Sequence, residues 1–432
     1  MGIRVYILFF LSISLFSKSI SQVDNNFRFK STFEKAKHVT FKNNHKSKYQ
    51  ISLLLPFCLD HNTFILSNSI DSLKDVNIDD YDLYKKTKIS LDFYLGFLLS
   101  LNAFKSIDID ISVFDIKEGL ESKEILANVV REGYLEDMDL IIGPLFTDNF
   151  VFFKDRFDSG IPIISPFSKK AHITDGNENV IQLATHVKNH LSFFSQYIFD
   201  HHVDDNLLLI RRDTILKVTN QKIAGLNEWE LKTDTLIPSD IDYGQIVLNG
   251  VDTSLFSFKE IKVLSNVIDS IHHELDTLGM KNVIIIPSDD NVFVADLLSK
   301  LHACRDTNMV VYGMPTLSNF NHISVYDLMD MNVTFPHNQF FNNAELSNFI
   351  INFYDHYNYS PHLKYASVGY ELGLYFMDFF WQDGFSISDL VNSDPRTILG
   401  TTYDFKKSKN GGYKNVATLI FQYDDFHCKR ID

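Results

Sequence analysis

Short apolar runs alternate along this chain with segments of helical periodicity, and this alternation restricts the possible folds more than any other feature. The first run, residues 51–57, reads Ile-Ser-Leu-Leu-Leu-Pro-Phe, which is typical of a strand buried on both faces. Residues 90–102 follow with apolar side chains at i, i+3, i+4 and i+7, the pattern of an amphipathic helix. Because strands that alternate with helices form parallel sheets with helices on their faces, the sequence predicts an α/β fold.

The alternation continues in two sets of elements. For the first set we expect further strands at residues 109–115, 139–143 and 162–166, and helices at residues 122–133 and 150–158. For the second set we expect helices at residues 186–202, 214–225, 258–278 and 291–302, and strands at residues 206–212, 230–237, 282–287 and 309–313. The boundary between the sets falls near residues 186–206, so the sequence predicts two α/β units.

The N-terminus has the layout of a secretory signal peptide. Residues 1–21 carry a lone Arg4, an apolar run over residues 5–16, and small residues at Ser19 and Ser21. We expect cleavage near Ser21, export to the periplasm, and a flexible polar lead-in over residues 22–48. The alternative is a retained anchor, although the apolar run is shorter than the ~20 residues of a spanning helix. No later apolar stretch approaches that length, so we expect no transmembrane segment in the mature chain.

Composition excludes several kinds of partner and site. The formal charge is −15, and losing Arg4 and Lys18 with the signal peptide leaves −15 − 2 = −17, which argues against nucleic acid. The acidic residues are dispersed, so a solvated acidic surface explains them without an acidic partner. Three cysteines, Cys58, Cys304 and Cys428, allow at most one disulfide, and we interpret them as free.

Four sequence motifs that mark nucleotide-binding, hydrolase or zinc sites find no support in this chain. It contains no P-loop, no G-x-S-x-G and no H-E-x-x-H, and no expected strand leads into G-x-G-x-x-G. Adjacent histidines and adjacent aspartates occur, but neighbours on a helix point in different directions and seldom share a metal ion. We therefore expect no catalytic residues, no metal site and no cofactor, and an enzyme is the least favoured class.

The ends of the expected strands are more informative, because open α/β sheets bind ligands outside the carboxyl ends of their strands. Serine, glycine and proline gather there, and small residues leave backbone N–H groups free to hold a carboxylate or carbonyl oxygen. An alternative is that these are ordinary turn residues. These strand ends are residues 56–57, 143–145, 165–168 and 287–289.

Several of these segments resemble, in order, the type I periplasmic solute-binding family of the leucine-binding kind. In the first half the similar segments are residues 51–57, 92–96, 139–144 and 161–166. In the second half they are residues 284–288, 311–315, 354–361, 366–371, 400–405 and 411–415. The resemblance extends over about residues 49–430 and is nearest to the Bacteroidetes branch, whose members often carry LysM modules. Residues 22–48 are too short for such a module.

The resemblance implies two Rossmann-like lobes with parallel sheets. It implies residues 49–195 as the first lobe, 196–330 as the second, and 331–432 as crossover helices and a hairpin that complete both. In the family a small ligand is held between the lobes and passed to an ABC permease. The resemblance therefore implies the candidate ligand-binding residues. In the first lobe these are Ser165 and Ser168, with Phe57, Tyr94 and Pro144 lining the cleft. In the second lobe Ser288 and Asp289 face them.

The sequence departs from the amino-acid binders at Phe167 and Lys169, where the family usually has small or hydroxylated residues. An amino-acid ligand is therefore not predicted, and an amino acid, a peptide or a cell-wall fragment all remain open. The main prediction is an exported solute-binding protein for an ABC-type importer. The alternative is a structural or regulatory envelope protein that uses the same fold to bind a protein or cell-wall partner.

Overall fold

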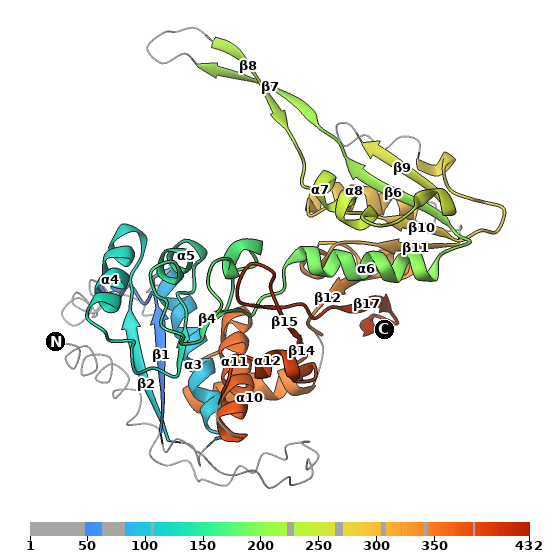
Figure 1. Ribbon diagram of the computed structural model, residues 1–432. Coiled ribbons are helices and arrows are strands. Elements are labelled where there is room, and N and C mark those ends of the chain that lie inside the picture. Colours follow the sequence, from blue (N-terminus) through green and yellow to red (C-terminus); the bar gives the residue numbers. More distant parts are fainter. Residues whose placement is uncertain are drawn as a thin grey trace, which may run out of the picture. The chain divides into compact units, whose positions relative to one another are not determined.

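The computed structural model describes residues 48–62, 83–104, 108–222, 229–263, 271–303, 308–320, 322–340, 344–382 and 385–432. The expected signal peptide and nearly all of the expected lead-in lie outside these residues, as does Cys304. The described elements include two seven-stranded sheets, each with helices on its faces (Figure 1). This confirms the predicted α/β fold with two lobes.

The first sheet has the strand order β15-β16-β5-β4-β3-β1-β2. Its parallel strands are β1 (Tyr49–Leu55), β2 (Ile109–Asp115), β3 (Leu140–Ile142), β4 (Ile163–Ser165), β5 (Val180–Gln182) and β16 (Tyr413–Asn415), with β15 (Phe405–Lys407) antiparallel at the edge. The helices of this lobe are α3 (Lys85–Leu101), α4 (Gly119–Arg131), α5 (Thr147–Lys154), α10 (Ala344–Tyr357) and α11 (Leu363–Gln382). Helices α4 and α5 share a buried cluster with strands β1, β3 and β4.

The second sheet has the order β18-β17-β12-β11-β10-β6-β9. Its strands are β6 (Asn206–Arg212), β9 (Ser257–Val263), β10 (Asn282–Ile285), β11 (Met309–Tyr312) and β12 (Thr334–His337), with β17 (Leu419–Asp424) and β18 (His427–Arg430) antiparallel at one edge. Its helices are α6 (Val187–His201), α7 (Asp240–Leu248), α8 (Asn291–His302) and α9 (Val325–Asp330). Leu207 and Leu209 pack with α6 and α7, whereas Leu208 and Ile210 pack with α8, so β6 is buried on both faces.

The chain passes between the two sheets three times, after β5, after β12 and after β16. The first passage precedes α6, which packs on the second sheet. More than one passage is what the expected two-lobed fold requires. The last hundred residues contribute to both sheets in this way.

Two expected helices are strands in the structure. Residues 214–225 contain β7 (Ile215–Lys222), which forms a separate antiparallel ribbon with β8 (Trp229–Leu236). The β-branched residues of this segment, Ile215, Val218 and Thr219, favour a strand. The expected helix at residues 258–278 begins within β9, whose sequence mixes apolar and charged residues, and its described end contains only the short 3₁₀ helix Ile271–His273. Residues 264–270 of this expected helix lie outside the described residues.

Helices α3 and α11 lie side by side in Figure 1 although they are far apart in the sequence. Glycine makes this close approach possible. A Cβ atom on Gly96 would overlap the carbonyl oxygen of Ala366, and one on Gly369 would overlap that of Phe93. The packing fixes the start of α11 beside the carboxyl end of the first sheet, where Tyr365 contacts Phe167 after β4.

Candidate functional site

The expected aromatic and proline residues gather at the carboxyl edge of the first sheet. Phe57, just after β1, packs edge-on against Tyr94 of α3, with ring centroids 5.9 Å apart. Pro144 follows β3 after a cis peptide bond from Gly143, whose φ of +94° suits glycine. The structure therefore brings together Phe57 and Tyr94 and places Pro144 at the same edge.

Ser165 and Ser168 stand at the end of β4. Ser165 is 1% exposed, and its hydroxyl has no hydrogen-bond partner among the described residues. The Ser168 hydroxyl accepts a hydrogen bond of 3.0 Å from Thr147, and its carbonyl accepts one of 2.8 Å from the Gln182 amide. Ser168 is thus held in place by its neighbours, whereas Ser165 retains an unused hydroxyl.

Ser288 and Asp289 stand at the end of β10 in the second lobe. The Ser288 hydroxyl accepts a hydrogen bond of 3.3 Å from the backbone N–H of Asp290, and Ser288 is 1% exposed. Asp289 accepts a hydrogen bond of 2.8 Å from the Thr316 hydroxyl and another from the Tyr243 hydroxyl. Burial, followed by this bond to Asp289, raises the pKa of Tyr243 to about 12, so it remains a hydrogen-bond donor.

Tyr243 and Thr316 were missed by the sequence analysis. Tyr243 comes from α7, and Thr316 lies in the short helix Pro315–Asn319 after β11. No local pattern distinguishes them, because they meet Asp289 only through the tertiary fold.

Next to Asp289 in the chain, Asp290 belongs to a cluster of ion pairs that fixes the start of α8. Arg212 pairs with Asp240 at 2.8 Å and with Asp290 at 2.7 Å. The other carboxylate oxygen of Asp290 caps α8 by accepting hydrogen bonds from Val292 and Phe293. These contacts keep the end of β10 and the start of α8 in a fixed geometry.

One electrostatic interaction connects the edges of the two lobes. Desolvation lowers the pKa of Lys169, which follows Ser168; Lys364 lowers it further, and Asp289 raises it. The Lys169 side chain is exposed, although the surrounding protein removes part of its hydration. Among the described residues no hydrogen bond joins Ser165 or Ser168 to Ser288 or Asp289.

Residues from all three chain passages meet at a histidine pair. His190 of α6 and His337 at the end of β12 stack with ring centroids 5.9 Å apart and planes 13° apart. His190 Nδ1 lies 3.0 Å from the hydroxyl of Thr418, which precedes β17. Burial lowers the pKa of both histidines, with His337 at about 3, and nearby Lys169 lowers both further. The imidazoles are therefore neutral near pH 7.

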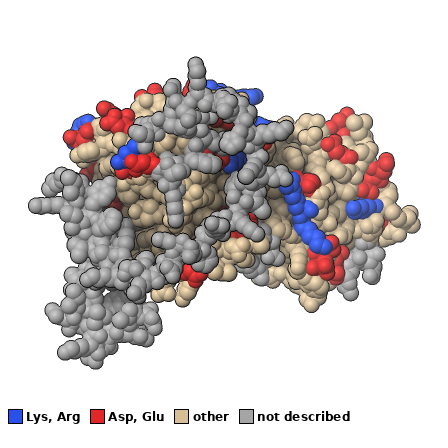
Figure 2. Space-filling view, turned by 90° about the horizontal axis from the view of Figure 1, so that it is seen from below, with Lys and Arg blue, Asp and Glu red and all other residues tan. Residues whose placement is uncertain are grey.

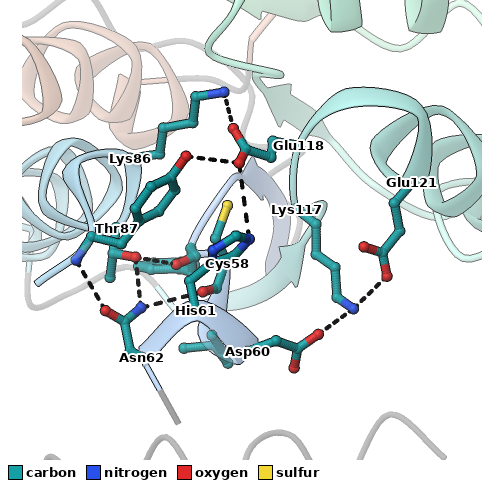
Figure 3. A network of polar contacts seen from close by, with 12 residues as sticks. Cys58, Asp60, His61, Asn62, Lys86, Thr87, Lys117, Glu118 and Glu121 are labelled. Carbon is teal, nitrogen blue, oxygen red and sulfur yellow. Dashed lines mark hydrogen bonds and ion pairs between the residues drawn. The ribbon is translucent and has the colours of Figure 1, made fainter. Parts of the chain in front are cut away.

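A network of polar contacts occupies the carboxyl ends of β1 and β2 (Figure 3). Glu118 accepts hydrogen bonds from Lys86 and from Tyr84 and lies 3.9 Å from His61. Lys86 and Tyr84 hold the pKa of the Glu118 carboxyl below its usual range. Nearby Cys58 is buried, and burial raises its thiol pKa to about 12, so it is not a thiolate at neutral pH. The network connects residues 58–62 after β1 with the start of α3 and does not activate Cys58.

Within the described residues, no three histidine, cysteine or acidic side chains are placed to hold a metal ion. In the same part of the chain, no helix combines the length and apolarity needed to cross a membrane. Acidic and basic side chains are interspersed on the surface visible in Figure 2. That surface shows no single block of acidic charge.

Comparisons with known proteins identify the fold. No family model and no curated protein matches the chain. One similar structure is a protein of Rhodospirillum rubrum that is provisionally described as a branched-chain amino acid ABC transporter. Its TM-score is 0.59 at 11% sequence identity, and the match covers 89% of this chain and 99% of that protein. The C-domain of LpoA from Haemophilus influenzae, described as a regulator of PBP1A, has a TM-score of 0.50 at 12% identity, covering 89% and 100%.

Full-length LpoA from the same organism has a TM-score of 0.51 at 13% identity, covering 90% of this chain and 60% of its own. At such identities the likeness concerns the fold and not the ligand. The two lobes, the sheet order and the three passages thus give this chain the type I periplasmic-binding-protein fold, as the sequence resemblance implied.

Proposed function

We propose that this protein is an exported solute-binding protein that holds a small polar ligand between its two lobes for an ABC-type importer. The proposal is supported by the position of the candidate residues at the carboxyl ends of β1, β3, β4 and β10, and by the buried Ser165 hydroxyl, which has no hydrogen-bond partner among the described residues. Open α/β sheets bind ligands at these edges, and two lobes joined by chain passages can close on a ligand. In this proposal the ligand lies among Phe57, Tyr94, Pro144, Ser165 and Ser168 on one wall. Ser288 and Asp289 form the other.

A thermal-shift screen of the full chain against amino acids, peptides and cell-wall fragments tests this proposal. A ligand that binds only the folded state raises the unfolding midpoint. Small-angle scattering then measures whether the ligand makes the molecule more compact, as closure requires. A screen without a hit, or a hit without any compaction, would count against the proposal.

The serine residues give a more local test. If Ser165 or Ser288 hydrogen-bonds the ligand, its replacement by alanine leaves a ligand group unpaired and costs about 1–3 kcal/mol, or roughly 5–150-fold in affinity. Both changes remove only one buried oxygen, so the unfolding midpoint should change little. Unchanged affinity in both variants would remove these serines from the site.

Export is part of the proposal and rests on residues 1–21 of the sequence. N-terminal sequencing of the mature protein should begin near Gln22. Recovery of intact Met1 from a cytoplasmic fraction would contradict export.

A second candidate is an envelope protein that uses this fold to bind a protein or cell-wall partner. The similarity to LpoA, described as a regulator of PBP1A, favours it, as does the separate β7–β8 ribbon, a ready strand pair for a partner. Under this proposal the Ser165→Ala and Ser288→Ala variants keep full partner binding, whereas changes on a distant surface abolish it.

A further inference from the structure

The turn between β17 and β18 holds a phenylalanine in an unfavourable backbone conformation. Asp424 and His427 are register partners, so Asp425 and Phe426 form a two-residue turn, with φ of +49° and +60°. A turn with positive φ at both residues favours Asn or Asp first and Gly second. Phe426 stands where glycine is preferred, and its Cβ crowds the backbone there.

Burial does not compensate for this strain. Leu399 also has a positive φ, of +49°, but its side chain is buried in a cluster with Phe349 and Tyr370. Phe426 is instead 53% exposed. Backbone strain that core packing does not explain is concentrated at functional sites, so the exposed ring requires another explanation.

The ring of Phe426 contacts a second exposed ring, that of Tyr326 in α9. The ring centroids lie 5.1 Å apart with planes 86° apart, and Tyr326 is 63% exposed. The backbone N–H of Phe426 donates a hydrogen bond of 3.1 Å to Sδ of Met329, also in α9. Exposed Tyr359, by contrast, contacts the buried ring of Phe353. Tyr326 and Phe426, the aromatic pair, are therefore two large rings held together at the surface.

Carboxylates lie next to both rings along the chain. Asp425 precedes the phenylalanine in the turn. In α9, Asp327 follows Tyr326 and Asp330 lies one helical turn further on. His302 Nδ1 lies 3.6 Å from a carboxylate oxygen of Asp327, and its Nε2 lies 3.0 Å from one of Asp330. No basic side chain among the described residues forms an ion pair with Asp425, so the surface beside the rings is negatively charged.

The aromatic pair lies at the opposite edge of the second sheet from the candidate solute site. Strands β12 and β17 are antiparallel, with Thr334 opposite Gln422 and His337 opposite Leu419. The carboxyl end of β17 therefore lies beside the amino end of β12, which runs parallel to β11 and β10. Asp289 follows the carboxyl end of β10. The two surfaces can thus act independently.

We propose that the aromatic pair is a docking site for an arginine-bearing segment of another protein. A guanidinium group stacks on aromatic rings and at the same time forms paired hydrogen bonds with a carboxylate. The two rings beside Asp425 and Asp327 offer both interactions. The same carboxylates repel the phosphate groups of a lipid surface, so this surface fits a protein and not a membrane. The inference goes beyond the proposed solute binding and does not depend on it.

The test uses a labelled peptide, Gly-Arg-Gly-Arg-Gly with blocked ends, and the full chain. Fluorescence anisotropy measures binding at constant ionic strength, so that general screening does not change between samples. The control peptide has citrulline in place of arginine, which keeps the shape and removes the charge. We expect the arginine peptide to bind in a saturable way and the citrulline peptide to bind at least threefold more weakly, on the order of one lost cation–π contact.

Variants locate the binding and separate it from folding. Phe426→Gly should weaken binding of the arginine peptide about threefold to thirtyfold, because it removes one ring. The same change relieves the turn, so the unfolding midpoint should stay the same or rise by about 1–3 °C. Phe426→Tyr keeps the ring and should bind within about twofold of the unchanged protein. Tyr134→Ala, at an exposed tyrosine of the first lobe, should bind normally.

The outcomes distinguish docking from a structural role. If Phe426→Gly lowers the midpoint and leaves peptide binding unchanged, the ring supports the hairpin and the inference is overturned. Equal binding of the arginine and citrulline peptides also overturns it. Vesicles of phosphatidylcholine should not bind, and vesicle binding that is lost in Phe426→Gly would assign the pair to a membrane instead. A solute from the thermal-shift screen should bind Phe426→Gly normally, so this inference and the proposed function can fail separately.

Discussion

At the scale of single residues, the buried carboxyl group of Glu371 makes folding depend on pH. Glu371 of α11 is 0% exposed and accepts hydrogen bonds of 2.9 Å from the Thr401 hydroxyl and 2.6 Å from the Tyr403 hydroxyl. Burial raises its pKa from 4.5 to about 8, although both hydrogen bonds lower it. Between these two values the folded protein keeps a proton that the unfolded chain releases. The free energy of unfolding therefore falls as pH rises through this window.

We predict that Glu371→Gln removes this dependence, because glutamine keeps an oxygen acceptor and does not titrate. Between about pH 5 and about pH 8.5, the variant should gain on the order of a few kcal/mol relative to the unchanged protein. Urea unfolding at each pH measures this difference. Glu124→Gln, on the exposed side of α4, is the control and should follow the unchanged protein. Parallel pH profiles for Glu371→Gln and the unchanged protein would show that Glu371 is not the cause.

At the scale of elements, the contact between α3 and α11 depends on the absence of side chains. We predict that Gly369→Ala destabilises the protein by about 1–3 kcal/mol, because its Cβ would overlap the backbone carbonyl of Phe93, which cannot rotate away. This loss exceeds the gain of about 1 kcal/mol that alanine brings to a helix interior. Denaturant unfolding measures the change.

Gly244→Ala in α7 is the matched control for the helix contact. Its nearest atom would be the side-chain Cδ of Arg211 at 3.3 Å, which can move by a few tenths of an ångström. Its stability should change by less than about 1 kcal/mol. Equal effects at the two glycines would mean that the α3–α11 approach is not unusually tight.

The β7–β8 ribbon should be dispensable for folding. Among the described residues its strands pair only with each other, and an isolated two-stranded ribbon adds little stability in water. Ile215 and Leu236 are register partners, so a short Gly-Ser linker can replace residues 215–236 without stretching the chain. We predict an unfolding midpoint within a few degrees of the original by calorimetry.

The control for the ribbon deletion is a chain that ends after Asp424. This truncation removes β18, which belongs to the second sheet, and Cys428, which packs on its core, so the midpoint should fall clearly. A ribbon deletion as damaging as this truncation would show that the ribbon supports the fold.

The elements that the sequence predicted well are those buried on both faces. Strands β1, β6 and β10 read as continuous apolar runs because helices cover both sides of each. Two strands were misread as helices: the edge strand β9, which mixes charged and apolar residues, and β7, which has no sheet partner beyond β8. The edge strand β2 and the ribbon strand β8 lie where the sequence predicted strands. The conformations of β7 and β9 are set by pairing, which the local sequence records only weakly.

The part of the candidate site that was predicted from the sequence depends on the buried strands as well. Residues directly after buried strands, such as Ser165 and Asp289, are located as soon as the strands are. Tyr243 and Lys364 come from helices and reach the site only through tertiary packing, which no local pattern encodes. Which of these residues bind a ligand remains a prediction.

At the scale of the whole molecule, the three chain passages share one histidine cluster, and this predicts sensitivity to acid. This cluster consists of the stacked pair His190 and His337. Lys169 disfavours a positive charge on both rings, and His186 and His337 disfavour one on His190. The folded pKa of His337, about 3, lies below its ordinary value of 6.5. As pH falls through this window, the unfolded chain takes up a proton that the folded state refuses. The free energy of unfolding therefore falls.

We predict that His337→Asn reduces this loss, because the asparagine oxygen can replace Nδ1 as acceptor for the backbone N–H of Gln339, now 3.0 Å away, without titrating. Between about pH 7 and about pH 4.5, the variant should lose less stability in urea unfolding than the unchanged protein. His172→Asn, at an exposed histidine of the first lobe, should lose as much as the unchanged protein.

Because the cluster joins all three passages, acid should also loosen the connection between the lobes. Small-angle scattering should show a larger radius of gyration at the lower pH in the unchanged protein than in His337→Asn, before either unfolds. Equal expansion in both would place the acid sensitivity outside the histidine cluster.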